Sequence, residues 1–175
     1  MKKTILLSIL LLNTIFGFSQ NEISKYSVPK GTKTIIAITD TNGVKNLKLA
    51  LFNAGFTFDI SNDGFWKTTN SIQVSVSQVF LNGLITKNDT GYTIVLKGQF
   101  DNSYMASAIT RGIAGPLAPS VTSILPIECR GQKGSVPNLT FLKLLQVADK
   151  LGVLIFEDFT SEKLIEFYSE DLENK

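Results

Sequence analysis

Residues 44–69 read VKNLKLALFNAGFTFDISNDGFWKTT, a sequence with the pattern of a helix followed by a hairpin. Apolar residues recur at spacings of three and four in its first part, which predicts an amphipathic helix over 44–54 that ends at Gly55. Apolar and polar residues then alternate, which predicts two strands, 56–60 and 65–69, joined by the turn sequence SNDG. A helix followed by a hairpin indicates a sheet whose neighbouring strands are antiparallel.

The flanking sequence extends the same pattern. Further strands are predicted at 33–39, 72–76, 84–85, 92–100, 127–129 and 153–156. Turn residues predict turns at Asn82-Gly83 and at 88–91. A second amphipathic helix is predicted over 137–151, and a short third helix is predicted to begin at Thr160 or Ser161. This order is typical of an α+β domain with one mainly antiparallel sheet, two amphipathic helices packed on one sheet face and a short C-terminal helix.

The other face of the predicted sheet is polar and is expected to meet water. The residues assigned to it are Thr57, Asp59, Gln73, Ser75 and Thr93.

The helix, Ala54-Gly55-Phe56, the Asp63-Gly64 turn and Lys67-Thr68-Thr69 together resemble small bacterial envelope domains of unknown function with a TBP-like or helix-grip fold. The later Gly131-x-x-Gly134, followed by a helix, is similar to them as well. The resemblance covers roughly a third of the mature chain, and it implies an α+β fold without implying any catalytic residue.

The amino terminus has the three parts of a secretory signal peptide. Lys2 and Lys3 provide the positive charge, residues 5–12 (ILLSILLL) are apolar apart from one serine, and Gly17-Phe18-Ser19 is a small-x-small triplet. The apolar run is well short of the roughly 20 residues that a membrane-spanning helix needs. We therefore expect residues 1–19 to be removed, which leaves no transmembrane anchor and places the protein in the periplasm or outside the cell.

The remainder is expected to be one domain over 33–175, with a flexible lead-in over 20–32 and a fraying acidic end. The chain has 17 basic residues, of which Lys2 and Lys3 lie in the signal peptide, against 15 acidic residues. The mature domain is formally neutral, so its overall charge gives no reason to expect a nucleic-acid partner.

The sequence contains no histidine and a single cysteine, Cys129. Without histidine, the usual catalytic triads and most zinc sites are excluded, so no catalytic residue, metal or cofactor is predicted. Cys129 is expected to be a buried, inert thiol, although the neighbouring Arg130 could instead activate it. A hydrolase that uses carboxylate, serine or lysine side chains remains an alternative, with Asp40, Asp59, Asp63 and Asp101 as the carboxylates available.

Residues 105–126 are apolar and contain three prolines, with Arg111 as their only charge. They are predicted to form a long loop with at most a short helix or strand, and so long a loop is either functional or a misread element. An apolar loop must cover something, either the core of its own domain or a binding partner. Ile113 and Leu117 lie in this loop, while Phe65 and Trp66 are strand neighbours of which one should be exposed. We therefore expect Phe65, Trp66, Arg111, Ile113 and Leu117 to form a binding surface for an apolar small ligand or an envelope protein. The function predicted from sequence is that of an exported, non-catalytic binding or accessory domain.

Overall fold

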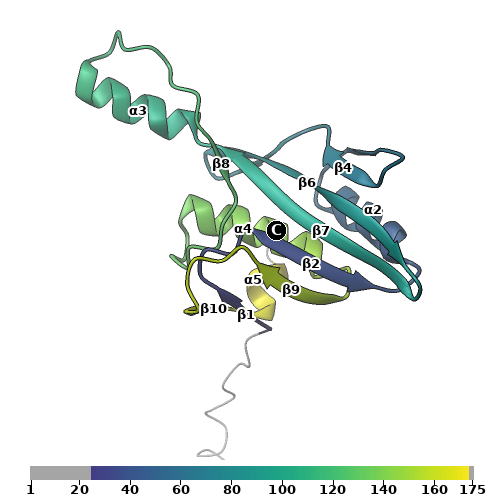
Figure 1. Cartoon of the computed structure of the whole chain (residues 1–175). Coiled ribbons are helices and arrows are strands. Elements are labelled where there is room, and N and C mark those ends of the chain that lie inside the picture. Colours follow the sequence, from purple (N-terminus) through teal and green to yellow (C-terminus); the bar gives the residue numbers. More distant parts are fainter. Residues whose placement is uncertain (1–24, 174–175) are drawn as a thin grey trace, which may run out of the picture.

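The computed structural model describes residues 25–173, which form an α+β structure (Figure 1). The helices of this part are α2 (Gly43–Asn53), α3 (Ser103–Ala114), α4 (Val136–Ala148) and α5 (Ser169–Glu173). Its strands are β1 (Tyr26–Pro29), β2 (Thr34–Thr39), β3 (Phe58–Ile60), β4 (Phe65–Thr68), β5 (Ile72–Val74), β6 (Ser77–Asn88), β7 (Gly91–Asp101), β8 (Ile124–Pro126), β9 (Val153–Glu157) and β10 (Leu164–Phe167). The predicted signal peptide lies outside the described residues.

The large sheet is antiparallel throughout. Its strands follow the order β3-β4-β6-β7-β2-β9, while the short β5 pairs with β6 and the short β8 pairs with β7. This arrangement confirms the prediction of an α+β fold with a mainly antiparallel sheet. The helix predicted over 44–54 and the strands around the SNDG turn are confirmed as α2, β3 and β4. Gly55, with φ of +89°, lies just past the end of α2, a conformation that glycine adopts without strain.

Strand β6 is a single 12-residue strand, so the turn predicted at Asn82-Gly83 is wrong. Both residues pair with β7 in the middle of the long β6–β7 hairpin. A Cβ atom at position 83 would overlap the carbonyl oxygen of Val95 and lie 2.7 Å from Nε1 of Trp66. Glycine is needed here because the packing is close, and the turn of this hairpin lies where it was predicted, between Asn88 and Gly91.

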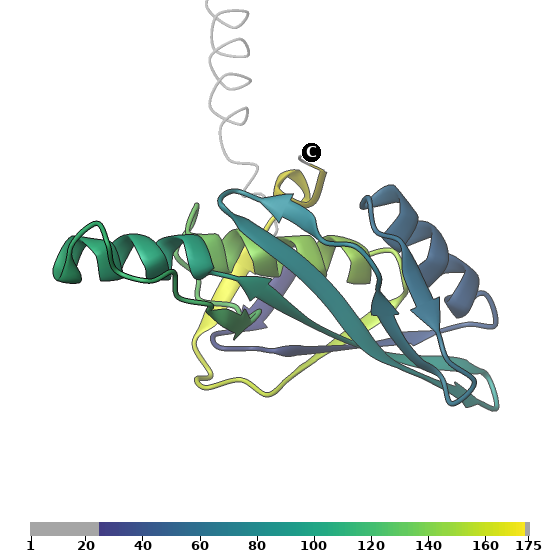
Figure 2. The same ribbon diagram turned by 90° about the horizontal axis from the view of Figure 1, so that it is seen from above.

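Helices α2 and α4 cover the same face of the sheet (Figure 2). Their apolar stripes are buried against it, through Leu47, Ala50 and Leu51 of α2 and Phe141, Leu144, Leu145 and Ala148 of α4. Ser135 caps α4, because its hydroxyl accepts a hydrogen bond from the Asn138 backbone N–H at 3.4 Å. The second predicted helix is thus confirmed, although it ends three residues earlier than expected.

The opposite face of the sheet is not covered by any described helix, and its centre is apolar. The strand register aligns Phe65, Leu84, Val95, Ile36 and Ile155 side by side across five strands, and we call these residues the apolar row. Phe65, Leu84 and Ile155 are each more than 40% exposed. The prediction of a largely polar, solvated face is therefore wrong at the centre of the sheet.

The two ends of the described chain pair with each other as a second, two-stranded sheet, β1–β10. Tyr26 pairs with Phe167, and Val28 is completely buried. The lead-in expected to be flexible therefore contains an ordered strand. The short helix predicted from Thr160 or Ser161 is also wrong, because the alternating sequence Leu164–Phe167 forms β10 and the last helix begins at Ser169.

A buried carboxylate, Asp149, joins the start of β1 to the end of α4. The Asp149 side chain, only 3% exposed, accepts a hydrogen bond from the Tyr26 hydroxyl at 2.8 Å and pairs with Lys25 at 2.8 Å and Lys150 at 2.9 Å. Burial acts to raise the pKa of Asp149, but the hydrogen bonds from Lys25, Lys150 and Tyr26 outweigh it and hold that pKa below its ordinary value. Burial, followed by the hydrogen bond to Asp149, raises the pKa of Tyr26.

We expect Asp149→Asn to lower the free energy of unfolding at neutral pH by about 1–3 kcal/mol, because charge-assisted hydrogen bonds are lost. A carboxylate whose pKa is lowered by folding contributes stability that is complete at neutral pH and is lost as the pH falls through its native pKa. Urea unfolding of the wild-type protein and the variant should therefore give a difference that shrinks on acidification. An equally large difference under acidic conditions would contradict this, and Asp89→Asn, in the exposed β6–β7 turn, serves as the control.

Candidate functional site

The segment predicted to be a long loop contains a helix. Residues 103–114 form α3. At its start, the Asp101 carboxylate accepts a hydrogen bond from the Ser103 N–H at 2.7 Å, and at its end Gly115 has a φ of +95°. The spacing of Met105, Ile109 and Ile113, four residues apart, is a helical signal. The glycines and prolines that suggested a loop lie mainly after the helix, in the segment that returns to β8.

Helix α3 and its return segment, residues 103–123, form an arm that projects from the body of the molecule in both views (Figures 1 and 2). No residue of α3 is buried. One side of the helix is fastened to the return segment, since the Ser107 hydroxyl accepts a hydrogen bond from the Val121 N–H at 2.9 Å and Arg111 donates one to Ser120 at 3.2 Å. The arm is therefore held together by its own hydrogen bonds.

The other side of the arm is apolar and open to solvent. Ile109 is 59% exposed, Ile113 84% and Leu117 97%. The sequence left open whether this segment covers its own core or meets a partner. Because these side chains lie beyond the edge of the body, the first alternative is wrong for Ile113 and Leu117.

At the base of the arm, an apolar hollow of about 380 Å³ separates α3 from the start of α4. Its lining is mainly apolar, with Phe100, Met105, Ile109, Leu125, Pro126, Val136 and Pro137. Glu128 and Arg130, which form an ion pair with each other, also line it. The apolar surface of the arm thus continues onto the body of the protein.

The predicted site residues lie in three separate places: on the arm, in the apolar row and in the buried core. Arg111, Ile113 and Leu117 lie together on the arm. Phe65 is 45% exposed and belongs to the apolar row, whereas Trp66 is completely buried, so the prediction that Trp66 contributes to a binding surface is wrong.

Phe65 and the arm are far apart along strand β6. Phe65 pairs with Leu84 of β6, while the arm follows Asp101, which pairs with Gln78 of the same strand. Six residues of a strand span about 20 Å. The arm and Phe65 therefore belong to separate surfaces.

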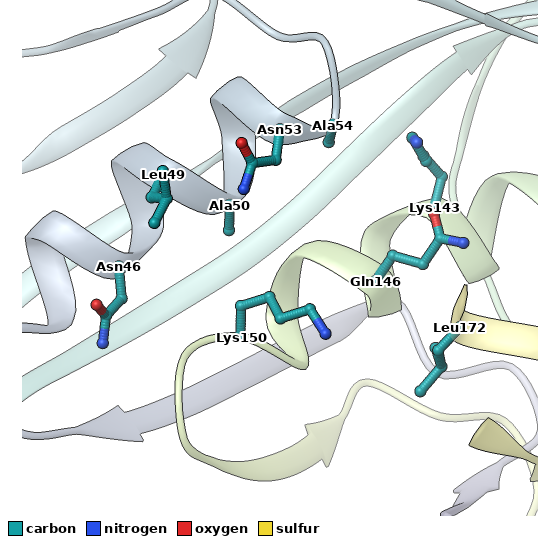
Figure 3. Close-up of a pocket in the computed structure, with 9 residues that line it drawn as sticks. All are labelled: Asn46, Leu49, Ala50, Asn53, Ala54, Lys143, Gln146, Lys150 and Leu172. Carbon is teal, nitrogen blue, oxygen red and sulfur yellow. The ribbon is translucent and has the colours of Figure 1, made fainter. Parts of the chain in front are cut away.

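A groove between α2 and α4 was not anticipated from the sequence (Figure 3). It has a volume of about 360 Å³ and is lined by Asn46, Leu49, Ala50, Asn53, Ala54, Lys143, Gln146, Lys150 and Leu172. Asn46 and Asn53 are seven residues apart and hence share one face of α2, as do Lys143, Gln146 and Lys150 on α4. This spacing is visible in the sequence, but it does not reveal that the two faces meet.

Three of the four carboxylates considered for hydrolysis have local structural roles, and the fourth, Asp59, is exposed on β3. Asp40, Asp63 and Asp101 each accept a hydrogen bond from the backbone N–H two residues further on, as is typical of turns that begin with aspartate. Asp40 follows β2 beside the start of β7, and Asp101 ends β7, so these two are separated by about nine residues of strand, or about 30 Å. They do not face each other across a cleft.

Cys129 is completely buried, and burial raises the pKa of its thiol to about 12. Arg130 is paired with Glu128 and does not activate the thiol. The expectation of a buried, inert cysteine is confirmed. The strand predicted at 127–129 is wrong, because β8 ends at Pro126.

Comparisons with protein-family models, with curated proteins and with solved structures found no match to this chain. Its function must therefore be argued from the arm, the groove and the apolar row.

Proposed function

We propose that this protein is an exported, non-catalytic accessory domain of the bacterial cell envelope that docks onto a partner protein through its arm. The observation that carries the proposal is the exposure of Ile113 and Leu117 at the tip of an ordered, projecting helix. Exposed apolar surface that is contiguous and ordered marks an interaction site in soluble proteins.

The shape of the arm favours a protein over a small molecule. Small ligands bind in concave pockets that bury most of their surface, whereas Ile113 and Leu117 lie on a projection. An amphipathic helix can instead insert its apolar face, through Met105, Ile109 and Ile113, into a groove of another protein. Because the hydrogen bonds of Ser107 with Val121 and of Arg111 with Ser120 already hold the arm together, docking loses little conformational entropy.

Replacing Ile113 and Leu117 together with serine should abolish partner binding and leave the fold intact. Exposed substitutions away from packed features change stability by about 0.5 kcal/mol or less. The test is photo-crosslinking in envelope extracts with a benzophenone amino acid at Tyr104, which is 68% exposed on α3, in the wild-type and double-serine proteins. Wild-type crosslinks to a defined protein that vanish in the variant would support the proposal.

The same crosslinker at Lys87, an exposed residue at the far end of β6, controls for random collisions. Identical crosslinked products from positions 104 and 87 would overturn the arm as a docking element. A loss of several kcal/mol of stability in the double-serine variant would show that the arm packs on the body instead.

Export is the second part of the proposal, and the signal peptide pattern of residues 1–19 supports it. Intact-mass measurement of protein from the envelope or medium should give a chain that begins at Gln20 or Asn21. Cleavage there leaves β1, which begins at Tyr26, complete. A chain in the envelope fraction that retains Met1 would contradict export by this route.

We also propose that the packing of the sheet against its helices is of the TBP-like or helix-grip type. The support is that α4 lies against the sheet with Phe141, Leu144 and Leu145 completely buried, as a gripping helix would. An experimental structure compared with those folds would test this, and a different strand order in them would refute it.

A further inference from the structure

Lys143 is half-buried and has no ion-pair partner within residues 25–173, unlike the half-buried Lys33, which pairs with Glu128. Lys25, Lys33, Lys97, Lys133 and Lys150 each form an ion pair. Within residues 25–173, no hydrogen bond or ion pair involves the Lys143 ammonium group, and burial lowers its pKa. A partly desolvated cation without a counter-charge is destabilised, and an anion bound beside it would relieve that cost.

The groove around Lys143 has the composition of an anion site. Asn53 and Ala54, at the end of α2, and Lys143 of α4 line the same end of the groove (Figure 3). The side-chain amide of Asn53, like that of Asn46 further along α2, has no hydrogen-bond partner within the described chain and can donate to a ligand. No acidic side chain of the described chain lines this groove.

A second hollow of about 390 Å³ lies next to the Lys143 end of the groove. Ala54, Lys143 and Gln146 line both hollows, and the second one adds the apolar side chains of Ile72, Val74, Leu139 and Leu142. The two hollows adjoin at Lys143, so a positive charge and amide groups lie next to an apolar wall. A ligand with a charged head and an apolar chain matches both parts.

The head group can be matched to the one lysine of the groove that has no counter-charge. Lys150, the other cation of the groove, lies 2.9 Å from the Asp149 carboxylate, a counter-charge that it shares with Lys25. Only Lys143 remains without a counter-charge among the described lining residues. A monoanion is enough to compensate this lysine, because Lys150 already contacts a carboxylate.

We propose that the groove between α2 and α4 binds a small amphipathic carboxylate, with its head group on Lys143 and Asn53 and its chain along Ile72, Val74 and Leu142. This site is independent of the arm, which lies beyond the other end of α4 (Figure 1). It would give the protein a ligand-binding activity in addition to the proposed docking role.

The probe is decanoate, a carboxylate on a straight apolar chain, titrated into the mature protein and followed by backbone amide NMR shifts. We expect saturable shifts at Asn53, Ala54, Lys143 and β5. Lys143→Gln, which removes the charge but keeps a long polar side chain, should weaken decanoate binding at least about tenfold, the factor that corresponds to about 1.4 kcal/mol. Lys87→Gln, an exposed lysine of β6 outside both hollows, should leave the affinity unchanged.

Two further ligands separate the head group from the chain. Acetate lacks the apolar chain and 1-decanol lacks the charge, so each should bind more weakly than decanoate. Equal affinity of decanoate for the wild-type protein and Lys143→Gln would overturn the proposal, as would shifts that cluster at the arm or the apolar row. Unfolding curves for both lysine variants confirm that the fold is intact, and the Ile113 and Leu117 double-serine protein should still bind decanoate.

Discussion

Replacing Trp66 with alanine should lower the free energy of unfolding by about 3–5 kcal/mol, the usual cost of removing a large aromatic side chain from a core. Trp66 is the largest completely buried side chain of the described chain, and it packs over Gly83 in the centre of the sheet. Its indole N–H has no hydrogen-bond partner within the described residues, so the loss would come from packing and apolar burial alone. Urea unfolding followed by circular dichroism measures the difference.

The neighbouring Phe65 provides a matched control. It is an aromatic residue of the same strand, but it points to the opposite face and is 45% exposed. Phe65→Ala should cost about 1 kcal/mol or less, because much of its surface already meets water. Equal losses for the two variants would show that the two sides of β4 have been assigned wrongly.

Gly83→Ala should destabilise the fold by about 3 kcal/mol or more, at the upper end of what overpacking a core causes. The added Cβ would overlap the carbonyl oxygen of Val95, and the neighbouring backbone of β7 cannot move without breaking its pairing with β6. The same atom would lie 2.7 Å from Trp66 Nε1. Thermal unfolding and amide exchange along β6 and β7 should both report the loss.

Gly112→Ala is the corresponding control, since a Cβ at this position of α3 meets nothing within 4 Å. Alanine favours helix over glycine by up to about 1 kcal/mol, so this variant should leave the fold unchanged or make the arm more stable. A large loss at Gly112, or a neutral result at Gly83, would contradict the packing described for each.

The parts of the fold that sequence predicted correctly are those with local causes. The α2 helix follows from apolar spacing within eleven residues and from the Gly55 stop, and the β3–β4 hairpin follows from its SNDG turn. Each of these signals lies within the element that it specifies or directly beside it.

The sequence predictions are wrong where contacts between residues distant in the sequence determine the local structure. Gly83 looks like a turn residue in its own neighbourhood, but Val95 and Trp66 require it to be glycine within a strand. Strand β1 has little local signal and is ordered by β10, more than 130 residues away. In the arm, the glycines and prolines after residue 114 concealed the helical spacing before it.

The candidate sites also divide into those with a local sequence signal and those that depend on distant contacts. The apolar composition around Ile113 and Leu117 indicated a surface worth testing, and the structure exposes both side chains. Alternation showed that either Phe65 or Trp66 would be exposed, but it could not say which. The groove could not be predicted, because Asn53 and Lys143 meet only when helices 90 residues apart pack on one sheet.

The pairing of β1 with β10 sets an order of assembly. During synthesis, residues 26–29 are made long before residues 164–167, with which they pair. The β1–β10 sheet therefore cannot form until nearly the whole chain has been synthesised. Contacts that span so much sequence form late and slow the completion of folding. A chain interrupted before residue 164 would lack β10, which would leave Val28 without its strand partner and β1 unpaired, in a form open to proteases and chaperones.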